Sequence, residues 1–338
     1  MAALKADHSA LPAAKPAGHP PDSEPRYVTA LAARLAAERD RLDADGGKPT
    51  ADGTPLRHSD AGKCARALSL KLAGVEPAPI DVAGLHVMHI GSLVHEQWQD
   101  ALREALEPQA HVDVEVTCRI PDIDHVASGH ADAVVYDDPA AGPNGEPGGH
   151  TTCIELKTQG GFGYKMAVGE RGAPQGPRHS AVLQGALNAA AVDADELVIA
   201  VLTTEAISKP AAARKGIDDT ARFAAEWSYS PDVFGPLAER EAARLAHIVE
   251  LHADGWLAPT AIPDPEIPWD ALVVDPATGR WEVRQPEPDG TVAVTATGET
   301  WMCGYCPFQQ ACAALDTPEA APVGALVDVL LPVAEVSS

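Results

Sequence analysis

The sequence lacks the features that would place the protein in a membrane or mark it as a basic nucleic-acid binder. No apolar run approaches the roughly 20 residues that span a bilayer. Basic residues are scarce, with 25 Lys and Arg against 49 Asp and Glu, and the formal net charge is -24. No secretory signal is recognisable, so we expect a soluble cytoplasmic protein without a membrane partner.

The acidic excess is uneven along the chain. It is concentrated in residues 101–150 and 251–338, whereas residues 151–250 are close to neutral. Proteins usually hold nucleic acid through basic side chains that contact phosphates. The near-neutral segment therefore predicts a DNA groove despite the total charge. The predicted contacts are Lys165, Arg171 and Arg178, with Lys63 and Arg66 as a second candidate path.

Hydrophobic periodicity and turn residues divide the chain into five segments. We expect a disordered tail in 1–24, a helix and loop in 25–56, an α/β core in 57–255, a linker with the last cysteines in 256–314, and a tail in 315–338. Within the core, strands are predicted at 112–120, 129–136, 152–158 and 196–204. Helices are predicted at 59–72, 88–106, 178–191 and 231–254, and a flexible glycine-rich loop at 160–164. Strands joined by a crossover helix predict a mixed sheet flanked by helices.

A short motif near the end of one predicted strand carries the first chemical signal. Glu155 and Lys157 are two positions apart, so in a strand their side chains share a face. Asp132 lies on an earlier predicted strand, which the turn-rich stretch 139–149 would fold back as a hairpin. Two carboxylates beside an ammonium suit a hard divalent cation and a polarised water. The spacing alone also fits two solvated strand residues, so both interpretations stay open at this point.

Four of the 6 cysteines form a second pattern. Cys303, Cys306 and Cys312 have the spacing C-x2-C-x5-C, and Cys64 stands far upstream. Four thiolates suit a tetrahedral zinc or an iron-sulfur cluster, and spacing does not distinguish them. Disulfides are the competing interpretation, which the absence of a secretory context disfavours. The remaining two cysteines fall in predicted strands, where we expect small buried side chains.

The order of these residues resembles the RecB-like branch of the PD-(D/E)XK nucleases. The resemblance covers about residues 57–312, and each of its pieces alone is unspecific. Its elements are Cys64, Gly91-x-x-x-His95, Gly129-x-x-Asp132, Glu155-x-Lys157, Gln184 and the three late cysteines. Within that branch the chain is most similar to the iron-sulfur exonucleases, which include the CRISPR-associated RecB-like nucleases, their phage homologues and the nuclease domain of AddB. The resemblance implies a PD-(D/E)XK core with a four-cysteine metal-cluster lobe.

The resemblance also implies a role for each matched residue. His95, Asp132 and Glu155 would bind Mg²⁺ or Mn²⁺ together with the backbone carbonyl of Leu156. Lys157 would serve the attacking water, and Gln184 would hold Lys157 and the DNA. The thiols of Cys64, Cys303, Cys306 and Cys312 would hold a 4Fe-4S cluster, with zinc as the alternative.

Two positions depart from the family pattern. Asn188 stands where the family usually has Tyr, and Ala65 stands where it often has Pro. An amide does not reproduce the reach or stacking of a phenol, so the Asn weakens the DNA contact expected near Gln184. We expect the metal site to be unaffected.

The sequence therefore predicts a metal-dependent DNA exonuclease that acts on single strands or free ends in recombination, repair or CRISPR adaptation. Protein partners in such a complex are expected as well. The alternative is a DNA-end-binding or recombination scaffold protein that keeps the fold without cutting. The set of His95, Asp132, Glu155 and Lys157 argues against this alternative, because a binder need not keep metal ligands. A zinc-finger-like module beside another hydrolase is disfavoured by the position of Cys64.

Overall fold

The computed structural model describes residues 53–107, 109–138, 149–258, 260, 305–315 and 320–326, and the backbone of three short strands between 272 and 296. The chain divides into two units, 1–46 and 47–338, and every described residue belongs to the second. The predicted tail 1–24, nearly all of 25–56 and Cys303 lie outside the described residues.

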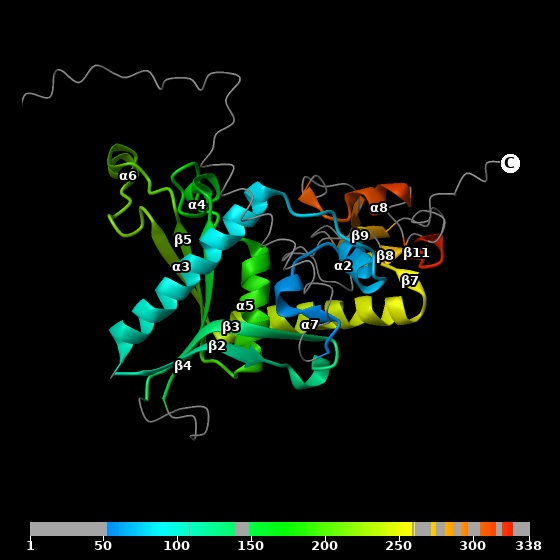
Figure 1. Ribbon diagram of the computed structural model, residues 1–338, viewed down its shortest axis with the longest axis horizontal. Helices are drawn as coiled ribbons and strands as arrows, with labels where there is room; N and C mark the ends of the chain where they lie inside the picture. The colour runs from blue at the N-terminus through cyan, green and yellow to red at the C-terminus, as the bar shows by residue number, and fades with distance from the viewer. Residues whose placement is uncertain are drawn as a thin grey trace, which may run out of the picture. The chain divides into compact units, whose positions relative to one another are not determined.

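A mixed six-stranded sheet forms the centre of the fold (Figure 1). Its strands are β1 (Leu56–Arg57), β2 (His111–Cys118), β3 (Ala127–Tyr136), β4 (Thr151–Gln159), β5 (Glu196–Thr203) and β6 (Ala224–Tyr229). They run in the order β1-β3-β4-β5-β6, with β2 also paired to β3. β3 and β4 are antiparallel, whereas β4 and β5 are parallel and are joined through a crossover helix. The predicted hairpin and mixed sheet are confirmed, and four strands begin and end within about two residues of their predicted bounds.

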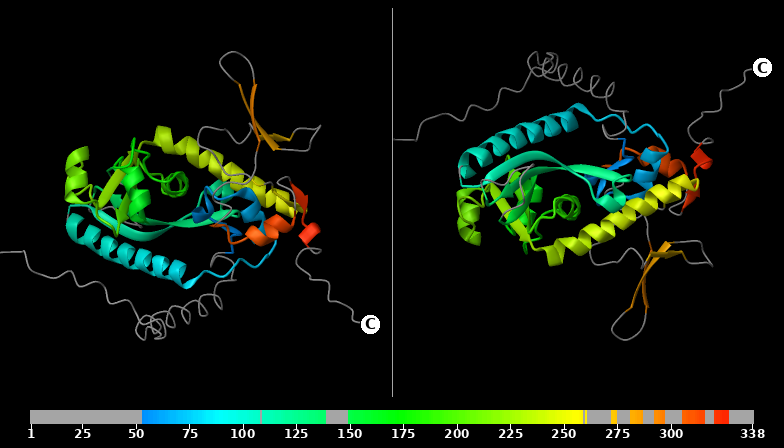
Figure 2. Two further views of the ribbon diagram at one scale, coloured as in Figure 1. Left: turned by 90° about the horizontal axis from the view of Figure 1, so that it is seen from above. Right: turned by 90° about the horizontal axis from the view of Figure 1, so that it is seen from below.

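Helices cover both faces of this sheet (Figure 2). On one face, α3 (Val82–Leu106) packs Trp98 and Leu102 against strand residues such as Leu156. On the other face lie α5 (His179–Ala191) and α7 (Pro231–Ala253), which pack with Cys153 and others in a second cluster. The alternation along β4 explains this division, because successive strand residues point to opposite faces.

The remaining elements are short. They are η1 (His58–Asp60), α2 (Ala65–Leu72), η2 (Pro121–Ile123), α4 (Gly161–Ala167), α6 (Lys209–Lys215), β7 (Trp256–Leu257), β8 (Leu272–Val274), β9 (Trp281–Pro286), β10 (Val292–Ala296), α8 (Gln309–Ala314) and β11 (Ala321–Pro322). Among the described helices, none combines the length and the hydropathy that a membrane span requires.

Three predicted segments of the core differ from the structure. The helix expected over 88–106 begins earlier, at Val82, where Asp81 caps it. The helix expected over 59–72 begins only at Ala65, and Cys64 is its N-cap rather than an interior residue. Gly62 is the physical reason, because its left-handed φ of 74° separates η1 from α2. The glycine-rich stretch 160–164 is not a loop but the start of α4. Tyr164 anchors that helix, since its ring is fully buried and its hydroxyl donates to the Ala221 carbonyl at 2.8 Å.

The predicted tail 315–338 is described in part. Its residues 320–326 pack against the fold, because β11 pairs with β7 and Leu326 is buried. Leu326 belongs to a small apolar cluster with Leu70, Val75 and Leu257. This cluster attaches α2 and the α8 region to the end of α7.

Candidate functional site

β3 and β4 separate beside Asp132. Their ladder ends at the pair Ala133 and Ile154. Just past that point the Asp132 carboxylate takes the place of a strand partner, and its Oδ2 accepts a hydrogen bond of 2.6 Å from the Leu156 backbone N–H. A buried backbone N–H needs an acceptor. The acid therefore caps the ladder at the position where it opens.

Helix α3 holds the other side of Asp132. Gln99 is buried, and its Nε2 donates to the Asp132 carbonyl and to Glu115 Oε1, each at 2.9 Å. Glu115 has a left-handed φ of 52°, which costs a non-glycine residue free energy unless its surroundings hold it. One turn earlier on the helix, His95 Nδ1 lies 3.5 Å from Asp132 Oδ1. His95 and Gln99 thus share the face that their spacing in the sequence predicts.

Glu155 lies on β4 with its carboxylate fully buried under α5. Its Oε1 accepts from Lys157 Nζ at 2.5 Å, and the same ammonium donates to Gln184 Oε1 at 3.0 Å. Its Oε2 accepts from Asn188 Nδ2 at 3.0 Å. Gly185 permits this close packing, because a Cβ there would lie 2.7 Å from Ile199 Cδ1.

The ionisable groups of the site influence one another. Burial raises the pKa of Glu155 to about 7; the nearby Asp132 carboxylate adds to that rise and Lys157 opposes it. The hydrogen bond to Asp132 raises the pKa of His95 above its ordinary value. Two carboxylates forced together in a desolvated site are relieved by a divalent cation.

The residues suit such a cation by chemistry, but they are not preassembled around one. Across the ranges that the structure describes, no three His, Cys, Asp or Glu side chains form a metal-ligand group. The reason is visible in the hydrogen bonds, since both Glu155 oxygens face protein donors and Asp132 Oδ2 faces Leu156. A cation held by His95, Asp132 and Glu155 would replace or share some of these bonds.

Asn188 corrects one expectation from the sequence. It is fully buried, so it does not offer a surface contact, and it donates directly to Glu155. This position therefore contacts a proposed metal ligand directly, a link that the sequence did not predict, and its effect on metal binding stays a prediction. Its second partner, His58, was not expected at all, because the two residues are 130 positions apart and no local pattern links them.

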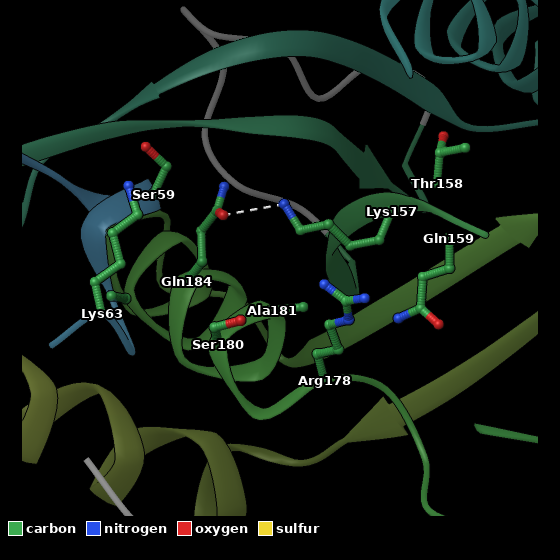
Figure 3. Close-up of a pocket in the computed structure, with 10 residues that line it drawn as sticks. Ser59, Lys63, Lys157, Thr158, Gln159, Arg178, Ser180, Ala181 and Gln184 are labelled. Atoms are coloured by element: carbon green, nitrogen blue, oxygen red, sulfur yellow. Dashed lines mark hydrogen bonds between the residues drawn. The ribbon is translucent and has the colours of Figure 1, made fainter. Parts of the chain in front are cut away.

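A pocket of about 220 Å³ opens beside Lys157, between η1 and the first turn of α5 (Figure 3). Its cationic side chains are Lys63, Lys157 and Arg178, and the hydroxyls of Ser59 and Ser180 also line it. None of the described lining residues is acidic, but two of the three cations are already in ion pairs, Lys63 with the buried Asp60 at 2.8 Å and Lys157 with Glu155 at 2.5 Å.

The other predicted DNA contacts divide into two groups. Lys165 and Arg171 lie on or just after α4, where the Arg171 guanidinium sits 5.3 Å from the centre of the exposed Phe162 ring. Arg66 is fully buried, and its Nε donates to the Ala258 carbonyl at 2.5 Å. The prediction that Arg66 contacts DNA is wrong for this reason.

The structure describes three of the four proposed cluster thiols. Cys64, Cys306 and Cys312 are half-buried and lie on or beside α2 and α8. Burial lowers the pKa of the Arg66 guanidinium, and the electrostatic influence of Cys312 and Cys64 opposes that shift, so both sulfur atoms lie within electrostatic reach of this buried side chain. The four-cysteine lobe itself stays a prediction, because Cys303 lies outside the described residues.

Comparison with known proteins leaves the family open. No family model and no curated protein matches the chain. Among solved structures, the chain is similar to SSO0001 at 14% identity, over 67% of this chain and 86% of that chain, with a TM-score of 0.38. It is similar to an alkaline exonuclease, LHK-Exo from Laribacter hongkongensis, at 14% identity over 59% of this chain and 90% of that chain, with a TM-score of 0.35. For the complex of LHK-Exo with dAMP the TM-score is 0.33. Scores this low establish neither a shared fold nor a shared function.

Proposed function

We propose that the protein is a metal-dependent deoxyribonuclease that degrades DNA from its ends. The observation that carries this proposal is the meeting of Asp132, Glu155 and Lys157 where β3 and β4 diverge, with His95 on one side of the sheet and Gln184 on the other. Two acids, an imidazole and an ammonium in one partly desolvated site suit phosphodiester hydrolysis.

Each residue has a role in the proposal. His95, Asp132, Glu155 and the Leu156 carbonyl would hold Mg²⁺ or Mn²⁺. The cation would neutralise phosphate charge and lower the pKa of its water. Lys157 donates to Glu155 and Gln184, so its ammonium is fixed where it can orient a water for in-line attack.

The DNA strand would reach this site along the pocket beside Lys157. Lys63, Lys157 and Arg178 bring positive charge to this pocket in a protein whose net charge is strongly negative, although Lys63 is paired with Asp60 and Lys157 with Glu155. Lys165 and Arg171 would extend the path over α4, where Phe162 offers an exposed ring for base stacking.

A DNA-end-binding protein that does not cut is the second candidate. One observation favours it, namely that the described ligands are not gathered around a cation position as they stand. Against it, a pure binder gains nothing from burying an acid whose pKa is raised to about 7.

A metal cluster on the cysteines is a separate proposal. Cys64, Cys303, Cys306 and Cys312 would hold 4Fe-4S, or zinc, and thereby join the beginning of the core to its end. Anaerobic purification followed by visible absorption and iron and zinc analysis tests this. Cys312→Ser should remove the metal, whereas the buried Cys118→Ser should retain it.

The nuclease proposal is tested with end-labelled linear DNA and covalently closed circular DNA in Mn²⁺, Mg²⁺ and EDTA. The expected result is metal-dependent loss of linear DNA while the closed circle survives. Lys157→Met should abolish cleavage. The control Lys71→Met removes a lysine on α2 that is paired with Asp60, and it should leave cleavage intact. Retardation of DNA without cleavage under every condition would support the binding protein instead.

A further inference from the structure

Behind Glu155 a chain of hydrogen bonds runs into the protein interior. Asn188 Nδ2 donates to Glu155 Oε2 and to the His130 carbonyl, each at 3.0 Å. Both partners are acceptors, so the orientation of the amide is determined and its Oδ1 must face the other way. There it lies 2.8 Å from His58 Nδ1. His58 must therefore carry its proton on Nδ1 and donate it to Asn188.

Glu155, Asn188 and His58, which form this series of hydrogen bonds, are all fully buried. His58 is neutral, because burial lowers its pKa below the ordinary value. Its Nε2 has no hydrogen-bond partner among the described residues. Gly129 makes room for the ring, since a Cβ at that position would lie 2.6 Å from it.

Stability alone does not explain this arrangement. A buried ring nitrogen without a partner costs free energy, and an apolar pair of the same shape would avoid that cost. The amide is needed for a different reason: it donates to Glu155 and accepts from His58 at once. A phenol at this position would not fix its own orientation in the same way, because its single O–H rotates.

We infer that Asn188 and His58 are positioning residues that hold the Glu155 carboxylate in the orientation in which it binds the catalytic cation. This inference rests on the proposed nuclease function. Lys157 holds one carboxylate oxygen and Asn188 holds the other, so the carboxylate plane is determined by two donors. Without the amide, Oε2 would be buried without a donor, and the carboxylate would rotate or take up a proton.

Two substitutions of His58 separate hydrogen bonding from packing. His58→Phe keeps a ring over Gly129 but removes the donor. His58→Asn loses ring volume but keeps an N–H donor at the same number of bonds from the backbone as Nδ1. A role in packing predicts that the Asn variant is the worse of the two, and a role in positioning predicts the reverse. Asn188→Leu, of similar size, removes the amide itself.

Ser69→Ala is the matched control. Ser69 is fully buried and its Oγ accepts from the Ala258 backbone N–H at 2.9 Å, so the control also removes one buried hydrogen bond, but one that does not touch Glu155. The measurements are kcat and KM for linear DNA, the dissociation constant for Mn²⁺ in the absence of DNA, and Tm.

Asn188→Leu should lower kcat and Mn²⁺ affinity by about tenfold, the effect of one lost hydrogen bond to a charged group. His58→Phe should lower both by about fivefold, because it removes a neutral hydrogen bond to the amide that holds Glu155, and KM for DNA should change little in either variant. His58→Asn and Ser69→Ala should stay within about twofold of the parental protein. Parental kcat and Mn²⁺ affinity in His58→Phe, or an equal loss in His58→Asn, would overturn the inference. If Asn188→Leu does not fold, the two His58 variants decide.

The inference and the proposed function fail in different ways. A parental protein that binds Mn²⁺ but leaves DNA intact would overturn the nuclease, and the Mn²⁺ affinities of the variants would still decide the positioning role. A parental protein that neither binds Mn²⁺ nor degrades DNA would overturn both.

Discussion

The buried carboxylate of Glu155 should make the stability of the metal-free protein fall as pH rises. Burial raises its pKa from 4.5 to about 7. The folded state therefore binds this proton more tightly than the unfolded state. The stabilisation is present in full below the unfolded pKa, declines between the two pKa values and is gone above the folded one.

The size of the effect follows from the two pKa values. A shift of this size corresponds to about 3 kcal/mol over the whole range, and about 2 kcal/mol of it is lost between about pH 5.5 and about pH 8.5. This interval avoids the sequence pI of 4.8, where the protein is least soluble.

The perturbation is Glu155→Gln, which removes the titration. The new amide also meets the Asn188 donor, so the substitution carries a constant offset. The quantity to compare is therefore the change with pH, measured by urea denaturation in EDTA. The free energy of unfolding of the parental protein should fall by about 2 kcal/mol more than that of the variant across this interval. Parallel curves would refute the reasoning.

The other predictions concern packing, DNA and the cation. Gly185→Ala should lower the free energy of unfolding by about 1–3 kcal/mol in urea denaturation, because the added Cβ forces α5 away from the sheet. Gly235→Ala is the control, since open space surrounds that position, and it should leave stability unchanged. Equal stabilities of the two variants would contradict this packing. Arg178→Glu should weaken DNA binding and make it depend less on salt, because a phosphate contact is lost. Arg240→Glu on α7 should have little effect on either property. If the two variants bind DNA equally, the DNA does not lie along this pocket. Mn²⁺ affinity should fall as the pH drops below the raised pKa of His95, because the cation must displace the proton of the imidazole. His95→Gln should make Mn²⁺ affinity depend less on pH. If the pH dependence is the same in the variant, His95 is not a ligand of the cation.

The elements with strong periodicity were predictable from sequence. β4 and α5 were found because apolar side chains alternate in the strand and recur along the helix. The contact of Lys157 with Gln184 agrees with the ordered motif. Boundaries that depend on single residues were missed, as at Gly62, whose left-handed backbone delays α2.

The support of the site was not predictable. Asn188 meets Glu155, and His58 meets Asn188, only after the crossover helix has packed on the sheet, and no sequence period relates positions so far apart. The burial of Arg66 was hidden for the same reason, since a charged residue in a helix is usually solvated and its acceptor comes from Ala258 after α7. Local patterns and the ordered resemblance thus predicted the candidate site residues, and tertiary packing determined what surrounds them.

The most direct test of the account is the rate at which linear end-labelled DNA is degraded in Mn²⁺ by the parental protein, Asp132→Asn and Asp113→Asn. Asp132 lies at the divergence of the strands, whereas Asp113 lies on β2 and pairs with His111. The account predicts degradation by the parental protein that EDTA abolishes, a loss of about a hundredfold or more in Asp132→Asn, and an unchanged rate in Asp113→Asn. Equal rates for the two variants, or degradation that persists in EDTA, would contradict it.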